Sequence, residues 1–146
     1  MSETTAADST AVAAAEVETR VRRIAELLQD KKGIDIVLLD LRAVTDTADF
    51  FVLCSGTSDL HVKALAEEVC DQLRIAGQGP WHVEGYESRR WVLVDFVDIV
   101  VHIFRQEIRD FYALERLWGD AVRTDVGPEW KGAVGIGQRE KVLPGT

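Results

Sequence analysis

The sequence WVLVDFVDIVVHIF, residues 91–104, decides the fold class of this chain. It holds two apolar runs, Trp91–Phe96 and Ile99–Phe104, separated only by Val97 and Asp98. Short runs rich in Val, Ile and Phe are typical of strands, and a connection of this length joins antiparallel neighbours. The stretch therefore predicts a β-hairpin.

Three further strands are expected around this hairpin. The run Ile36–Leu41 is closed by a charged residue, and Phe50–Leu53 ends before a Ser-Gly turn; the polar loop Thr45–Asp49 joins the two. The run Trp81–Glu84 precedes the hairpin and reaches it through the turn residues Gly85–Ser88. Turn residues of this kind end strands and connect antiparallel neighbours. The chain therefore predicts one sheet of about five strands.

Amphipathic helices are expected before, between and after these strands. Apolar residues recur at helical spacing in Val17–Leu28, in Val62–Leu73 and in Ile108–Trp118. Gly33 stands where a left-handed cap would end the first helix, and Thr57 or Ser58 is suited to begin the second. The predicted fold class is α/β, or α+β, with a single mixed sheet flanked by helices, and a nucleotidyltransferase-like topology fits this order.

The length of 146 residues predicts one domain. Residues 1–16 are almost all small or polar and are expected to be a flexible tail or an N-terminal extension of the first helix. Residues 119–146 are rich in Gly and carry no regular apolar period, and they are expected to be a flexible C-terminal extension. The domain is thus placed at residues 17–118.

The net charge of −8, from 17 basic and 25 acidic residues, argues against a protein that follows nucleic-acid phosphates. Most of the acidic excess lies within residues 17–118, so a basic protein is the expected partner. Two cysteines and the lack of a long apolar run predict a reduced compartment without a membrane span, and the N-terminus lacks signal-peptide features. The cytoplasm is the expected location.

Catalytic and metal-binding signatures are not apparent. The chemically reactive side chains are too scattered for a zinc pattern, and the glycines of residues 132–137 lack the strand and helix that a phosphate loop needs. Spacing leaves open a Cys54 nucleophile with His61 or His102 as its base, although no flanking signature supports it. We therefore expect no catalytic residue, no metal and no cofactor. The scattered side chains are Cys54, His61, Cys70, His82 and His102.

A nucleotidyltransferase-like enzyme is the main catalytic alternative. Residues 54–58 lie between a strand and a helix, where such enzymes bind phosphates, and Asp95 and Asp98 lie on later strands. Two metal ligands on one strand face need a spacing of two residues, because side chains alternate, whereas these aspartates are three apart. We expect them instead to cap the hairpin turn.

Aromatic and acidic residues gather in the last third of the predicted domain. Trp and Tyr often anchor protein interfaces, although rings of this kind also fill the cores of small sheets. Tyr86, in a polar turn, is the ring least expected to be buried. The gathered residues are Trp81, Glu84, Tyr86, Trp91, Asp95, Asp98, Phe111, Tyr112, Glu115 and Trp118.

Several of these stretches together resemble the ribosomal silencing factor family, also called Iojap-like proteins. The resemblance covers residues 17–118 in order and without large gaps. The family often has Gly before the Asp of the hairpin turn, where this chain has Val97. The matching stretches are residues 50–58, 83–86, 91–95, 98–104 and 109–118.

The resemblance implies a translation repressor that is not an enzyme and often forms a homodimer. Such proteins bind the large ribosomal subunit through ribosomal protein L-fourteen, block the small subunit and lower translation when nutrients are scarce. The alternatives are the nucleotidyltransferase-like enzyme and a homodimeric module for another basic partner. The contact residues carried over to this sequence are Glu84, Tyr86, Trp91, Asp95, Asp98, Arg109, Tyr112 and Glu115.

Overall fold

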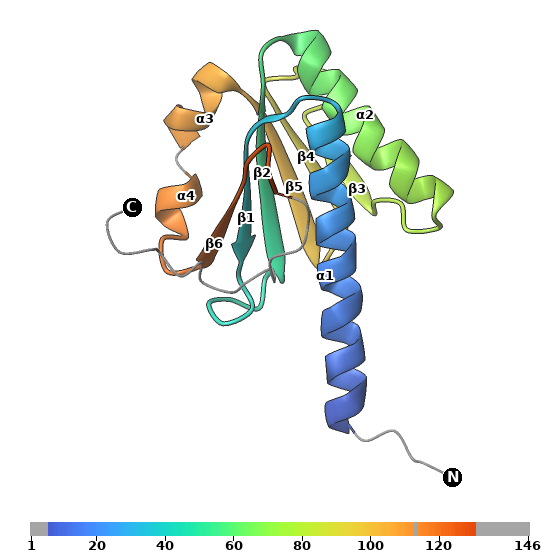
Figure 1. The fold of residues 1–146 in the computed structure, drawn as a ribbon. Coiled ribbons are helices and arrows are strands. Elements are labelled where there is room, and N and C mark those ends of the chain that lie inside the picture. The colour runs from blue at the N-terminus through green and yellow to red at the C-terminus, as the bar shows by residue number, and fades with distance from the viewer. Residues whose placement is uncertain (1–5, 113, 131–146) are drawn as a thin grey trace.

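The computed structural model describes residues 6–112 and 114–130, which form one six-stranded mixed sheet with helices on both faces (Figure 1). The strands follow the order β3-β4-β5-β2-β1-β6 across the sheet. The strands are β1 (Ile34–Asp40), β2 (Phe50–Gly56), β3 (His82–Glu84), β4 (Trp91–Asp95), β5 (Ile99–Arg105) and β6 (Val122–Val126). The helices are α1 (Ala6–Asp30), α2 (Asp59–Ile75), α3 (Gln106–Tyr112) and α4 (Leu114–Leu117).

The strand pairing confirms the predicted fold class. β3, β4 and β5 pair antiparallel in sequence order, as their short connections require. β1 and β2 also pair antiparallel, while β2 and β5 are parallel and bring the two halves together. The sheet is therefore mixed, and α2 belongs to the crossover that connects its parallel strands.

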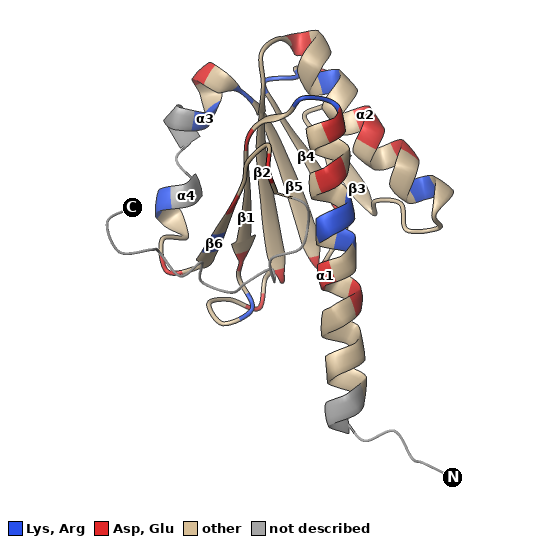
Figure 2. Ribbon diagram, viewed as in Figure 1, with Lys and Arg blue, Asp and Glu red and all other residues tan. Residues whose placement is uncertain are grey.

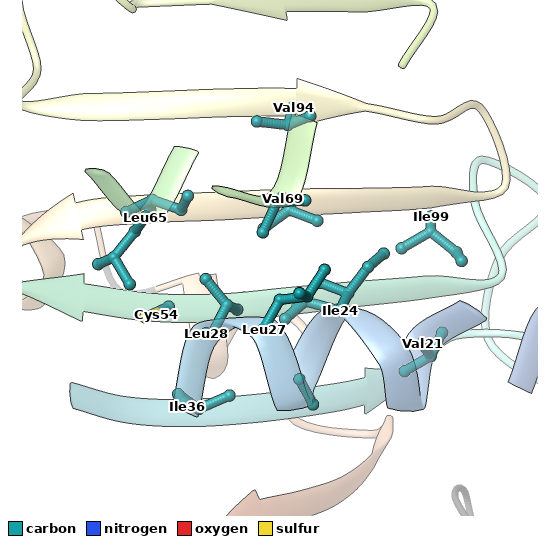
Figure 3. Close-up of a cluster of buried hydrophobic side chains, with 14 of the residues drawn as sticks. Val21, Ile24, Leu27, Leu28, Ile36, Cys54, Leu65, Val69, Val94 and Ile99 are labelled. Carbon is teal, nitrogen blue, oxygen red and sulfur yellow. The ribbon is translucent and has the colours of Figure 1, made fainter. Parts of the chain in front are cut away.

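One face of the sheet, which we call the helical face, is covered by α1 and α2 (Figure 3). Ile24 and Leu28 of α1, with Leu65 and Val69 of α2, pack against alternate residues of the strands, such as Val94. These side chains are almost completely removed from water. Each such burial stabilises the fold by about 1.5–3 kcal/mol.

The opposite face carries a second, smaller core. Leu39, Phe51 and Phe104 are buried there, with Ile108 of α3 and Trp118 packed against them. α3 packs on β2 and β5, so the part of this face formed by β3 and β4 lies beyond the described helices. The sheet therefore has one half-covered face.

Residues after 118 contribute a strand that the sequence analysis did not predict. Val122–Val126 pairs antiparallel with β1, and Val126 lies opposite Ile36. The prediction of a flexible extension from residue 119 is therefore wrong for residues 122–126, and β6 is the sixth strand of a sheet predicted to have about five. Arg123 and Asp125 alternate with the buried Thr124 and Val126, which is the pattern of a half-buried strand. Residues 131–146 lie outside the described residues.

At the N-terminus, residues 6–16 form the helical extension that was one of the two predictions for this segment, and this part of α1 projects beyond the sheet (Figure 1). The predicted cap at Gly33 is wrong in detail. Lys32, with φ of 59°, takes the left-handed position, while the N–H of Gly33 donates to the carbonyl of Leu28 at 2.8 Å. This pair of residues closes α1 as a Schellman motif. Gly77, with φ of 74°, follows the end of α2, and its N–H donates to the carbonyl of Arg74 at 2.9 Å.

Candidate partner-binding surface

Glu84, Trp91 and Asp95 lie together on the half-covered face. Val92 and Val94 of β4 point into the helical-face core, so the alternating Trp91, Leu93 and Asp95 point the other way. The pairing of β3 with β4 places Glu84 beside Leu93 and His82 beside Asp95. We call these five residues (His82, Glu84, Trp91, Leu93 and Asp95) the β3–β4 surface.

Trp91 is held in one orientation by its neighbours on β5. Its indole Nε1 donates a hydrogen bond to Nδ1 of His102 at 3.1 Å, and its ring stacks on Phe104 with centroids 5.2 Å apart. The ring is half-buried, so part of it remains open to solvent. A half-exposed indole in a fixed position is a favourable anchor for a partner, because little side-chain entropy is lost on binding.

His102 supports this indole from within the second core. It is 4% exposed and is surrounded by aromatic rings, with that of Phe51 at 4.7 Å. Burial without a charged partner lowers the pKa of His102 to about 4. The imidazole is therefore neutral near pH 7 and can accept the hydrogen bond from Trp91.

The rest of the β3–β4 surface combines acidic and aromatic groups. Glu84 Oε1 lies 3.0 Å from His82 Nε2, and both side chains are largely open to solvent. Oδ1 of Asp95 accepts a hydrogen bond from the N–H of Val97 at 2.7 Å, which confirms the predicted capping of the hairpin turn by this aspartate. Trp81, 74% exposed, lies beside His82 at the edge of the sheet.

Tyr86 does not join these residues. Its hydroxyl donates to Glu67 of α2 at 2.8 Å, so the side chain turns toward the helical side of the sheet. This hydrogen bond raises the pKa of Tyr86, and the guanidinium of Arg89 lies 5.9 Å from the centre of its ring. The ring, expected to be the most exposed, is half-buried by these contacts.

Asp98 and Arg109 connect elements within the fold. The carboxylate of Asp98 accepts hydrogen bonds from Arg20 of α1, and its carbonyl accepts from the N–H of Asp49 at 2.8 Å. Arg109 is 8% exposed and donates to Oγ of Ser55 at 3.0 Å and to the backbone carbonyl of Asp35 in β1. The side chains of Tyr112 and Glu115, also predicted for the site, lie outside the described part.

Cys54 and His102, which were considered as a nucleophile and its base, lie on opposite faces of the sheet. Cys54 pairs in register with Ile103, so it lies on the helical face while His102 lies on the other. Burial raises the pKa of Cys54 to about 12, which disfavours the reactive thiolate. Both ring nitrogens of His61 lie within hydrogen-bond distance of backbone atoms, those of Thr57 and Lys31. In the described residues, no group of three potential ligands is arranged to hold a metal ion.

No described helix combines the length and apolar character that a membrane crossing needs.

The sequence analysis missed His102, Leu93 and His82 as members or supports of this surface. The sequence could have placed one of them, because every second residue of a strand points to the same face of the sheet. Leu93 is two residues from both Trp91 and Asp95. The proximity of His102 to Trp91 depends on the register between β4 and β5, in which Trp91 lies opposite Phe104.

Comparison with known proteins identifies the family of this chain. The family described as "Ribosomal silencing factor during starvation" matches residues 14–141. The ribosomal silencing factor of Bacillus subtilis is 44% identical over 97 residues, which cover 66% of this chain and 82% of that protein. An Iojap-related mitochondrial protein of Arabidopsis thaliana is 28% identical over 100 residues, covering 65% of this chain and 54% of that protein.

A solved structure agrees with these matches. The crystal structure of a protein from Chromobacterium violaceum superimposes with a TM-score of 0.64 at 39% identity, covering 82% of this chain and 92% of that one. The resemblance noted in the sequence is thus confirmed by matches across most of the chain. The chain belongs to the ribosomal silencing factor family.

Proposed function

We propose that this protein represses translation by binding the large ribosomal subunit through the β3–β4 surface. Its contact there is ribosomal protein L-fourteen, and the bound protein blocks joining of the small subunit when nutrients are limiting. The observation that carries the proposal is the half-exposed indole of Trp91, fixed by His102 and Phe104 among acidic groups. The protein acts by occupying a surface and needs no catalytic step.

Charge and shape both support a basic protein as the partner. Glu84 and Asp95 place two carboxylates beside the indole, and the whole chain carries a net charge of −8. Ribosomal proteins are generally basic, so complementary charge accelerates encounter, while the buried part of an aromatic anchor supplies affinity. The same negative charge disfavours direct binding to RNA phosphates.

The free protein is proposed to be a homodimer in the cytoplasm. The half-covered face leaves Trp91, Leu93 and Val100 only half-buried in one copy. Apolar groups exposed on neighbouring strands favour association, and a second copy is one partner that would cover them. A dimer formed through this face must dissociate before the subunit binds, so dimerisation and ribosome binding would then compete.

Co-sedimentation with purified large subunits tests this proposal. Trp91→Ala is expected to weaken binding at least about tenfold, because truncating a hot-spot tryptophan commonly costs about 2 kcal/mol or more of binding free energy. Ile75→Ala removes a 79% exposed apolar side chain from α2 and is the matched control, with binding unchanged. Circular dichroism establishes that both variants remain folded. Glu84→Lys is expected to slow association, whereas Glu87→Lys in the nearby loop has a smaller effect.

Subunit joining in sucrose gradients provides the functional readout. Saturating wild-type protein is expected to reduce full ribosome formation, and Trp91→Ala to restore it. Normal joining at saturating wild-type protein would contradict the proposed repression. Ribosome binding that survives both Trp91→Ala and Glu84→Lys would place the contact elsewhere on the molecule.

A further inference from the structure

A groove lies between α1 and the β6 edge of the sheet. Its volume is about 910 Å³, near the upper end of the roughly 300–1,000 Å³ typical of ligand sites. Ile36 and Val126 contribute buried apolar side chains, and Pro128 lies beside them. The groove is distant in the strand order from the β3–β4 surface, since β6 and β3 are opposite edges of the sheet.

Carboxylates dominate the charged lining of this groove. Glu26, Asp30, Asp35 and Asp125 contribute negative charge, against the ammonium of Lys32. Asp125 is paired with Arg123 at 2.9 Å, whereas no ion pair to Glu26, Asp30 or Asp35 is found within the described part of the chain. Figure 2 shows the acidic residues along the C-terminal half of α1. The groove therefore presents negative charge that internal cations do not neutralise.

Trp130 forms a fixed aromatic wall in the same groove. Its ring is 8% exposed and belongs to the helical-face core. Gln29 of α1 ties the segment in place by donating to the carbonyl of Gly127 at 2.8 Å. The indole N–H of Trp130 is buried and has no hydrogen-bond acceptor in residues 6–112 and 114–130. A buried donor without an acceptor is an unusual feature, which makes the indole N–H a sensitive reporter of changes in the groove.

These features together select the chemistry of the occupant. Carboxylates attract ammonium and guanidinium groups by charge. The apolar floor accommodates aliphatic side chains. A metal ion is disfavoured because the described residues contain no suitable ligand cluster, and RNA is disfavoured by the negative charge.

We propose that this groove binds an extended Lys- or Arg-containing segment of a second protein. The groove lies on the helical side at the β6 edge, so one molecule can fill it while its β3–β4 surface is engaged. The proposal does not depend on the ribosomal partner proposed above. Its consequence is that the chain has two separate protein-binding surfaces, both directed at basic partners.

A peptide titration followed by NMR tests this binding. The probe is the blocked hexapeptide Lys-Val-Arg-Val-Lys-Gly, added to the full-length protein labelled with nitrogen-15. Each of the 4 tryptophans contributes one indole N–H signal, and Trp130→Phe assigns the signal of the groove. A saturable shift of the Trp130 signal is expected with this peptide and not with the blocked peptide Glu-Val-Asp-Val-Glu-Gly.

Matched variants identify the carboxylates responsible. Glu26→Gln with Asp30→Asn is expected to weaken peptide binding about tenfold, since each exposed ion pair contributes up to about 1 kcal/mol. Glu67→Gln with Asp71→Asn removes the same charge from α2 and is expected to leave binding unchanged. If both double variants weakened peptide binding equally, the effect would come from the overall charge of the protein, and the proposal would be overturned.

Two other outcomes would also overturn it. A Trp130 signal that does not move with the basic peptide means that the groove does not accept such a segment, including the case in which residues 131–146 of the chain occupy it. Spermidine binding as tightly as the peptide, at the same signal, would mean that the groove selects a small amine. Because the readout is local to Trp130, loss of ribosome binding at the β3–β4 surface leaves this test unaffected.

Discussion

Nε1 of Trp91 donates a hydrogen bond to Nδ1 of His102 between the neighbouring strands β4 and β5, over 3.1 Å. The neutral imidazole therefore carries its proton on Nε2, which is buried and finds no acceptor among the described residues. The half-buried indole of Trp91 is thus oriented by a residue of the second core. The stability of that core and the position of Trp91 are coupled through this one contact.

Acid is expected to destabilise the fold through His102. Its pKa is lowered to about 4, against 6.5 for the unfolded chain, so the unfolded state binds the proton more readily. The free energy of unfolding contributed by this residue is present above pH 6.5 and falls as the pH drops toward 4. The loss over that interval is about 3 kcal/mol.

Urea unfolding of the wild type and His102→Leu at several pH values measures this effect. Carboxylates titrate in both proteins, so the difference between the two curves isolates the imidazole. The wild type is expected to lose stability more steeply between pH 6.5 and 4. Parallel curves would show that His102 titrates normally in the folded protein.

Val97→Gly is expected to stabilise the protein. Val97 has φ of 78° and is 63% exposed, so a β-branched residue occupies a left-handed position with little packing to offset its strain. Such strain costs about 1–3 kcal/mol, and glycine removes it. The greater flexibility of glycine in the unfolded chain opposes this gain by roughly 0.5–1 kcal/mol. A net gain of about 1 kcal/mol should appear as a higher midpoint in thermal unfolding.

Val44→Gly is the control for this substitution. Val44 is 39% exposed in a loop and its φ is not positive. There the glycine relieves no strain, so the entropy of the unfolded chain makes the variant less stable. Stabilisation by both substitutions would argue against strain at Val97.

Asp98→Asn is expected to affect stability and not ribosome binding. Asp98 receives two hydrogen bonds from Arg20, whose side chain is 13% exposed, so the substitution weakens the connection between α1 and the β4–β5 turn. The expected loss is about 1 kcal/mol, because Glu16 still pairs with the guanidinium. Asp71→Asn, in an exposed pair with Arg74, should change stability by less than about 0.5 kcal/mol.

Chemical denaturation and co-sedimentation of the Asp98→Asn protein distinguish the two roles of this residue. The resemblance to the family assigned Asp98 to the partner contact. Loss of subunit binding without loss of stability would support that assignment over the connecting role described here.

Gly33→Ala is expected to destabilise the protein by about 2 kcal/mol through overpacking. A Cβ at this position would lie 2.5 Å from Sγ of Cys54 and 3.1 Å from the carbonyl oxygen of Leu28. The φ of Gly33 is not in the left-handed region, so the cost is steric contact and not backbone strain.

Cys54→Ala should rescue part of this loss. Alone it opens a small cavity and costs about 1 kcal/mol, but combined with Gly33→Ala it removes the atom in the closest contact. Double-mutant analysis by thermal unfolding is expected to give a favourable coupling. Strict additivity would mean that Leu28 or Leu65, and not Cys54, limits the space.

Much of the fold was predictable because its elements are encoded locally. The hairpin of residues 91–104, the stripe of α2 and the turn at Gly77 each follow from period, length and turn chemistry within a few residues. β6 was missed because its local signal is short. Five residues alternate between charged and less polar side chains, and the place of the strand in the sheet depends on pairing with β1, which is far away in the sequence.

The candidate site also has a part that the sequence predicts and a part that only the fold decides. Alternation along β4 places Trp91 and Asp95 on one face, and this could be read from the sequence. Tyr86 appeared equivalent to them because it lies nearby in the chain, yet its bond to Glu67 of α2 turns it to the other side. The resemblance implied a partner contact for Arg109, but the structure buries it against Ser55.

The sequence by itself determined the mixed α/β class, the acidic character and the family of this protein, because composition, period and motif order are properties of the chain. The tertiary structure alone decided which half-buried aromatic ring is held in one orientation, which charges hold the fold together and where the acidic groove lies. Those properties depend on contacts between residues far apart in the chain, such as Arg20 with Asp98 and Gln29 with Gly127. Distance and burial set the energies of such contacts, and both exist only after folding.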